Sequence, residues 1–141
     1  MKGFSISTDN SQFEFDVIYQ FISNSYWAKG ISKSTLKKAI TNSLCFAVFN
    51  QQQQQIGFAR LITDRATYAY LADVFILESY RGLGLSKWLM THIVAHDDLQ
   101  GLRRIVLATK DAHGLYAQFG FKAIENPETL MQVWQPNIYQ S

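Results

Sequence analysis

The feature that most limits the possible folds of this chain is the junction at residues 71–86. The run 67–77 is rich in aromatic and β-branched residues, which is typical of a strand. It breaks into a turn that contains Gly82 and Gly84, and from 85 to 93 an apolar residue recurs every fourth position. A strand that passes through a glycine turn into a core-facing helix indicates a sheet with helices packed against it.

The rest of the chain alternates between strand-like and helical patterns. The expected elements are a strand at 3–8, a helix ending near Tyr26–Trp27, a helix capped by Ser32 or Ser34, strands at 44–50 and 56–63, a helix at 82–96, a strand at 104–109, a helix at 111–119 ended by Gly120, and strands at 121–124 and 130–135. The glutamine tract 51–55 is interpreted as a hairpin loop. These elements predict an α+β fold with a mixed, mostly antiparallel sheet, in a single domain over 1–141.

Composition argues against several classes of function. The chain has 141 residues, 48% of them apolar, which suits one domain with one core. Its formal charge is +2 and the basic residues are dispersed, so we expect no nucleic-acid partner. No window approaches the roughly 20 apolar residues of a membrane span, and the first residues lack the apolar stretch of a signal peptide. We therefore expect a cytoplasmic protein with no membrane partner.

The thiol and the potential metal ligands do not form a recognisable site. Cys45 is the only cysteine and lies in the apolar run 44–49, so we interpret it as a buried structural thiol rather than a nucleophile. The group His96–Asp98 follows the long helix and is interpreted as a solvated loop. We expect no metal.

The junction after the central strand has the chemistry of an anion-binding site. The N–H groups of a first helical turn lack intrahelical partners, and the helix dipole places about half a positive charge there. Gly82 and Gly84 let a phosphate approach the main chain, and Arg81 can donate a charge-assisted hydrogen bond. The complete patterns of dinucleotide-binding folds and nucleotide P-loops are missing. A glycine pair before a helix is also compatible with a simple tight turn.

At these residues the sequence resembles the GNAT superfamily of N-acetyltransferases. The superfamily signature is Arg or Gln, two residues, Gly, one residue, then Gly or Ala, directly after the fourth strand. Arg81, Gly84 and Ser86 occupy those places, and Ser86 is a small departure from the pattern. A second family-like element at 111–121 matches at Ala112, Tyr116, Gly120 and Phe121.

The resemblance implies a fold and a cosubstrate. The fold is the α/β/α layered GNAT fold, with a sheet of about seven strands and about four helices. The cosubstrate is acetyl-coenzyme A, and the chain is then an acyltransferase. The pyrophosphate of acetyl-coenzyme A is expected on Arg81, Gly82, Leu83, Gly84, Leu85 and Ser86. Its pantetheine arm is expected along the main chain of Val74, Phe75 and Ile76.

The catalytic candidates follow from what acetyl transfer to an amine requires. A phenol with a pKa near 10 stays protonated at neutral pH, so Tyr116 can act as the general acid that protonates the departing thiolate. The alternative is that Tyr116 only packs near the sulfur. Asp73 and His113 are candidate general bases, although Asp73 can instead pair with a basic side chain. An amine with a lowered pKa needs no dedicated base.

The acceptor is not identified by sequence. The superfamily usually selects it near the first two helices, where Tyr26 and Trp27 can stack on a substrate or bind an ammonium, or simply belong to the core. A primary amine of a small molecule is the preferred interpretation. The alternatives are a non-catalytic acyl-coenzyme A sensor and a protein or peptide N-acetyltransferase. A homodimer formed through the C-terminal segment, with Trp134 and Tyr139, is also open.

Overall fold

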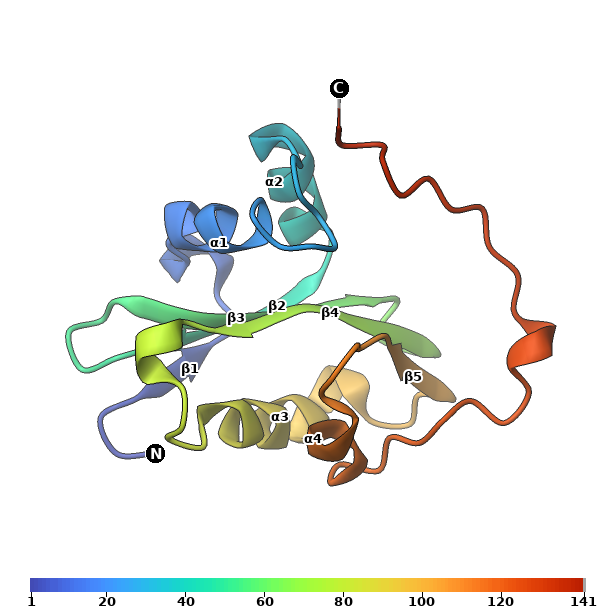
Figure 1. Cartoon of the computed structure of the whole chain (residues 1–141). Coiled ribbons are helices and arrows are strands. Elements are labelled where there is room, and N and C mark those ends of the chain that lie inside the picture. Colours follow the sequence, from blue (N-terminus) through green and yellow to red (C-terminus); the bar gives the residue numbers. More distant parts are fainter. Residues whose placement is uncertain (141) are drawn as a thin grey trace.

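A computed structural model describes residues 1–140 and contains one five-stranded sheet (Figure 1). The strands, in their order across the sheet, are β1 (Ser5–Ser7), β2 (Leu44–Phe49), β3 (Gln55–Thr63), β4 (Tyr68–Ile76) and β5 (Arg104–Leu107). Neighbouring strands are antiparallel except β4 and β5, which are parallel. The predicted mixed, mostly antiparallel sheet is confirmed.

Helices cover both faces of this sheet. They are α1 (Phe15–Ile22), α2 (Lys33–Thr41), α3 (Leu85–Ala95) and α4 (His113–Ala117). The first two lie on one face and the last two on the other (Figure 1). Each face has its own apolar core, one containing Ile18, Leu36 and Phe58 and the other containing Phe46 and Leu89. Within residues 1–140 no helix has the length and apolar character needed to cross a membrane.

Two of the predicted helix caps are present. Ser32 precedes α2, and its hydroxyl accepts a hydrogen bond from the Thr35 N–H at 3.2 Å. Gly120 follows α4 with a φ of 91°, and the Phe121 N–H donates back to the Tyr116 carbonyl at 3.3 Å. Ser32 therefore marks the start of α2 on one face of the sheet, and Gly120 marks the turn that follows α4 on the other face.

The first helix is shorter than predicted. It ends at Ile22, whereas the apolar spacing predicts an end near Tyr26–Trp27. The Ser25 hydroxyl donates to the Ile22 carbonyl at 2.6 Å and accepts from the Ala28 N–H at 3.2 Å. These bonds to Ser25 replace helical hydrogen bonds after Ile22, so the helix stops there. Tyr26 and Trp27 therefore lie in the loop after α1.

The glutamine tract is a loop only in part. Gln55 begins β3 and is buried. Its Oε1 accepts from the Glu14 N–H at 2.8 Å, and its Nε2 donates to the Gly57 carbonyl at 3.1 Å. The last glutamine therefore ties the start of α1 to the sheet.

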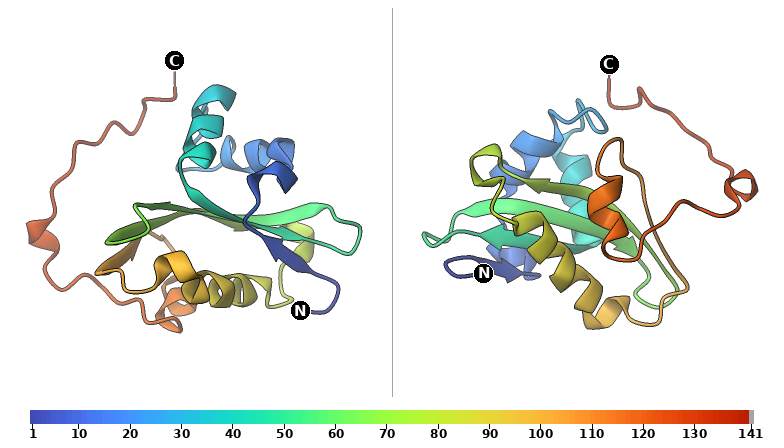
Figure 2. Two further views of the ribbon diagram at one scale, coloured as in Figure 1. Left: turned by 180° about the vertical axis from the view of Figure 1, so that it is seen from behind. Right: turned by 60° about the horizontal axis from the view of Figure 1, so that its bottom comes forward.

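The two predicted C-terminal strands are not present. Residues 121–140 contain only a short 3₁₀ turn at Pro127–Thr129 and otherwise run extended, away from the sheet (Figures 1 and 2). The count is therefore five strands rather than about seven. The apolar composition of 130–135 favours an extended backbone, but a strand also needs an edge beside it, and that depends on tertiary structure.

Candidate active site

A β-bulge reshapes β4 at Asp73. Arg60 of β3 pairs with Ala72 of β4, but Phe58 pairs with Phe75, so β4 carries one extra residue between these pairs. Asp73 has a φ of 55°, a left-handed conformation that is uncommon outside glycine. Bulges bend a strand and frequently lie beside active sites, where they re-aim side chains. Nothing in the apolar pattern of 67–77 indicates this extra residue.

Beyond the bulge, β4 separates from β5. The two strands pair from Tyr68 with Arg104 to Leu71 with Leu107, whereas β4 continues to Ile76. A cleft of about 820 Å³ opens there. Its lining includes β4 from residue 70 onward, the loop after β5, α4 and the loop after α1. The cleft therefore lies where two parallel strands diverge at their carboxyl ends.

The start of α3 presents a row of unpaired main-chain donors. The N–H groups of residues 82–87 donate to no main-chain carbonyl in the described part of the chain. Gly82 and Gly84 have φ values of 83° and 82°, and a Cβ built on either would meet no atom within 4 Å. Arg81 and Ser86 line the cleft. An open turn with free N–H groups at one end of a cleft suits a phosphate.

The Arg81 side chain joins this turn to the sheet. Its Nε–H donates to the Ile76 carbonyl at 3.0 Å, at the end of β4. The guanidinium has five N–H donors in a fixed plane, so one bond to β4 leaves the others for an anion. This contact holds the strand end and the glycine turn in a fixed relation.

Asp73 is engaged by two neighbours. Its side chain is buried, Oδ2 lies 2.8 Å from the Arg60 Nε, and Oδ1 accepts from the Trp27 indole N–H at 2.7 Å. A second Arg60 nitrogen donates to the Ser43 hydroxyl at 3.2 Å. The pairing with a basic side chain, left open by the sequence, is present. The carboxylate also lines the cleft, where lone pairs not used by these bonds remain on its oxygens.

Tyr26 and Trp27 lie at the cleft and contact each other. Their rings meet edge to face with centroids 5.0 Å apart, and both side chains are substantially exposed. The Lys110 ammonium lies 3.9 Å from the centroid of the Tyr26 ring. The loop after α1 therefore reaches the loop after β5, and an aromatic face already binds a cation.

Tyr116 reaches the cleft from α4. The residue is only 9% exposed, and burial raises the pKa of its phenol. Its hydroxyl has no hydrogen-bond partner within residues 1–140, yet no buried side-chain oxygen or nitrogen there is left without one. The ring is therefore buried while the hydroxyl meets the open cleft. A phenol with a raised pKa remains a proton donor at neutral pH.

Comparison with known proteins identifies the family. The family model described as the acetyltransferase (GNAT) domain matches residues 41–123. The chain belongs to the GNAT acetyltransferase family. It is similar to a Xanthomonas campestris pv. campestris protein of known crystal structure that is named as a predicted acetyltransferase of the GNAT family. The two are 47% identical, with a TM-score of 0.96 over 100% of this chain and 99% of the other.

Two further proteins are less similar. A Gibberella zeae protein named as a predicted acetyltransferase is 29% identical, and the match covers 80% of this chain and 75% of that protein. The N-acetylglutamate synthase of Neisseria gonorrhoeae, whose crystal structure contains coenzyme A and N-acetyl-glutamate, shares the fold at 16% identity. Its TM-score is 0.68, over 89% of this chain and 30% of that one.

In this GNAT chain, the fold brings most of the sequence candidates to one cleft. Val74, Phe75, Ile76, Arg81, Ser86, Asp73, Tyr116, Tyr26 and Trp27 all line it. Gly82, Leu83, Gly84 and Leu85 belong to the adjoining turn and helix start. His113 is exposed and does not line the cleft.

Sequence reasoning missed several residues that line the cleft, among them Arg60, Lys110 and Tyr139. Arg60 pairs with Asp73, Lys110 covers Tyr26, and Tyr139 arrives from the far end of the chain. No local pattern marks these residues: Arg60 and Tyr139 come from segments remote in sequence from the motifs, and Lys110 lies just before the second motif but outside its pattern. An isolated basic residue in an apolar strand is the one available signal, and it applies only to Arg60.

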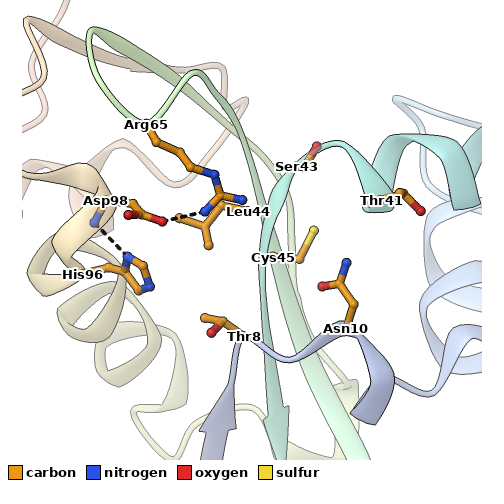
Figure 3. Close-up of a pocket in the computed structure, with 9 residues that line it drawn as sticks. All are labelled: Thr8, Asn10, Thr41, Ser43, Leu44, Cys45, Arg65, His96 and Asp98. Atoms are coloured by element: carbon orange, nitrogen blue, oxygen red, sulfur yellow. Dashed lines mark hydrogen bonds and ion pairs between the residues drawn. The ribbon is translucent and has the colours of Figure 1, made fainter.

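A smaller cavity of about 260 Å³ lies away from this cleft, beside the start of β2 (Figure 3). His96 accepts from the Asp98 N–H at 3.1 Å, and Asp98 pairs with Arg65. His96 and Asp98 therefore make contacts that hold the loop after α3, which agrees with the loop interpreted from the sequence. No cluster of three or more metal-ligating side chains occurs within residues 1–140.

Cys45, which also borders the smaller cavity, is expected to resist alkylation. It is 1% exposed, and burial raises the pKa of its thiol to about 12. At neutral pH this lowers the reactive thiolate fraction by roughly 1000-fold relative to an ordinary cysteine. Mass spectrometry after treatment with iodoacetamide should show an unmodified native protein and one adduct after denaturation. Rapid modification of the native protein would contradict this burial.

Proposed function

We propose that the protein transfers the acetyl group of acetyl-coenzyme A to a primary amine of a small molecule. The observation that carries the proposal is the row of free N–H groups at 82–87, opening onto a cleft between diverging strands. A pyrophosphate needs several donors and close approach to the main chain, and the left-handed glycines allow both. Both cores pack against the same sheet, which supports a single domain over 1–141.

In this proposal the end of β4 binds the pantetheine arm through its main chain. The side chain of Phe75 is buried and stacks on Phe21 with ring centroids 4.1 Å apart, and Ile76 is buried as well. These side chains are committed to the cores, so they hold the strand end in place. Beyond Leu71, the main-chain groups of β4 that do not bond to β3 or Arg81 have no β5 partner and are available to a ligand.

Tyr116 is proposed as the general acid. Bound acetyl-coenzyme A supplies the thioester that the amine attacks, and a thiolate leaves when the tetrahedral intermediate collapses. The Tyr116 hydroxyl, unpaired and facing the cleft, can give that thiolate its proton. The raised pKa keeps the proton on the phenol until it is needed.

Asp73 is proposed to orient the acceptor side of the cleft and to receive the amine proton. Its bonds to Arg60 and Trp27 fix the positions of both side chains. Each carboxylate oxygen has a further lone pair, which can accept the proton directly or through water.

The acceptor is proposed to lie against Tyr26 and Trp27. The Lys110 contact illustrates that the Tyr26 ring suits a cation, so an ammonium group of a substrate can replace Lys110 there. A cleft of about 820 Å³ falls within the usual range for small ligands, roughly 300–1,000 Å³.

Binding of acetyl-coenzyme A tests the proposed cosubstrate site. Isothermal titration calorimetry should give measurable binding to the native protein and a roughly 10- to 100-fold loss in Arg81→Ala, because one charge-assisted hydrogen bond contributes about 1.5–3 kcal/mol. Arg103→Ala removes an equal charge from an exposed position outside the cleft and should leave the affinity unchanged. An equal loss in both variants, or no binding at all, would refute the site.

A further inference from the structure

Lys110 places a primary amine of the protein itself in the cleft. The residue follows the end of β5 at Leu107, in the loop that lines the cleft. Its ammonium lies 3.9 Å from the centroid of the Tyr26 ring, which belongs to the loop after α1, a different segment of the lining. The Lys110 nitrogen therefore occupies the position in which the ammonium group of an acceptor is proposed to bind.

No ion pair within residues 1–140 holds this ammonium in place. The ion pairs found there are formed by other basic residues. Contact between an ammonium and an aromatic face contributes only about 0.5–1 kcal/mol at an exposed site. Lys110 is exposed and its four-carbon stem is flexible, so the nitrogen can leave the ring and reach other parts of the cleft at little cost in free energy.

Two other lysines make the same kind of contact outside the cleft. The Lys33 ammonium lies 5.5 Å from the centroid of the Tyr19 ring, and the Lys37 ammonium lies 4.9 Å from that of the Phe15 ring. Both lysines belong to α2, and neither lines the cleft. What distinguishes Lys110 is therefore its place in the cleft, not its contact with an aromatic ring.

The groups proposed to act on a small amine line the same cleft as Lys110. Residues 107–112 line it without a break, and Tyr116 of α4 and Asp73 of β4 line it as well. A group tethered by a short flexible linker has an effective concentration roughly in the millimolar range. Lys110 therefore meets an acyl group in the cleft about as often as a small amine supplied at millimolar concentration would.

We infer that Lys110 is itself an acetyl acceptor, and that the protein acetylates this side chain within its own cleft when no small amine is present. The inference rests on the proposed use of acetyl-coenzyme A. It adds a modification site on the chain and a second class of acceptor, a lysine amine delivered by the protein to its own active site.

The reaction uses the same side chains as transfer to a small amine. The Lys110 ammonium gives one proton to water, and the neutral Nζ attacks the thioester carbonyl carbon. A C–N bond forms and the C–S bond breaks. The nitrogen gives its second proton to Asp73, Tyr116 protonates the leaving thiolate, and exchange with water restores both side chains. The products are an amide on Lys110 and free coenzyme A, and the amide no longer carries the charge that contacts Tyr26.

Incubation with acetyl-coenzyme A in the absence of any added amine tests the inference. Peptide mapping by mass spectrometry should find Lys110 acetylated at least about tenfold faster than Lys37, because only Lys110 reaches the proposed general acid, whose usual contribution is roughly 10²- to 10⁴-fold. Lys110→Arg keeps the positive charge and should abolish the fast acetylation of the protein, whereas the matched variant Lys37→Arg should retain it. Equal rates at Lys110 and Lys37 would overturn the inference.

Two further measurements separate transfer within the cleft from other routes. A thioester also acylates amines without a catalyst, so Tyr116→Phe should lower the rate at Lys110 by at least about tenfold and leave the rate at Lys37 unchanged. At saturating acetyl-coenzyme A, the rate per chain at Lys110 should not depend on protein concentration, because amine and cleft belong to one chain. A rate that rises in proportion to protein concentration would show transfer between copies and refute the reaction within one cleft.

The same protein preparation distinguishes failure of this inference from failure of the proposed function. Suppose that acetyl-coenzyme A binds in calorimetry and that thiol is released with small amines, while Lys110 is acetylated no faster than Lys37. The proposed function then stands and the inference about Lys110 is wrong. If acetyl-coenzyme A does not bind at all, the proposed cosubstrate site is refuted, and the inference about Lys110 with it.

Discussion

Replacing Tyr116 by Phe is expected to lower kcat for acetyl transfer by roughly 10²- to 10⁴-fold, the usual contribution of a general acid. The ring is buried and only the hydroxyl meets the cleft, so the variant keeps the packing and loses the proton donor. Acetyl-coenzyme A affinity, measured by calorimetry, should change little. Thiol release in the presence of an amine panel measures the rate.

Tyr80→Phe is the matched control. It removes a phenol that bonds to the Asn50 side chain at 2.9 Å and does not line the cleft. The control should retain full kcat. If Tyr116→Phe also retained full kcat, the general-acid role would be wrong. If the native protein bound acetyl-coenzyme A but released no thiol with any amine, the sensor alternative would be favoured.

The pH dependence of transfer provides a second readout for Tyr116. Burial raises the pKa of the phenol above its ordinary value of 10, so the donor form is complete at neutral pH and is lost only as the pH rises past that value. A loss of activity between pH 7 and 9 would therefore come from another group.

Replacing Asp73 by Leu is expected to destabilise the protein by about 3–5 kcal/mol, because it leaves the mostly buried Arg60 charge without its partner. The Trp27 indole N–H loses its acceptor as well. For a chain of this size the loss corresponds to a fall in Tm of about 10–15 °C. Thermal unfolding followed by circular dichroism measures it.

The double variant Arg60→Met/Asp73→Leu distinguishes the contribution of the ion pair to stability from the proposed role of Asp73 in catalysis. With both charges replaced by apolar groups, part of the lost stability should return, because no unpaired charge is left in the cleft wall, whereas a leucine at position 73 keeps the strain of a φ near 55°. If the double variant were no more stable than Asp73→Leu alone, the unpaired Arg60 charge would not be the main cause of the lost stability. Full transfer activity in the double variant would contradict the proposed role of Asp73 in accepting the amine proton.

Much of the fold was predictable because local patterns are strong in the middle of the chain. The apolar run of β4, the glycines at 82 and 84 and the apolar residue at every fourth position of α3 locate the turn that is proposed to bind the pyrophosphate, without any knowledge of tertiary contacts. The position of Tyr116 on a short helix was also predictable, because its motif includes Gly120, which follows α4 with a positive φ. In these segments, short-range sterics and capping determine the backbone.

The cleft itself was not predictable from local pattern. The bulge at Asp73 needs a register shift between β3 and β4, and the separation of β4 from β5 needs β5 to end early. The pairing of Asp73 with Arg60 and the contact of Tyr26 with Lys110 join residues far apart in the chain. Register and long-range ion pairs depend on how whole strands align, which no short window contains.

The C-terminal segment separates the two kinds of information most clearly. By itself the sequence determined that 130–135 is mostly apolar and favours an extended backbone, and that Gly82 and Gly84 form a turn before the start of α3. Only the tertiary structure decided that, within residues 1–140, the segment pairs with no strand, because the chain leaves the sheet after α4 and Tyr139 lies close to Gly30 in the loop after α1. Backbone preference is local, whereas strand pairing requires a free edge within reach, and that edge is a property of the assembled sheet.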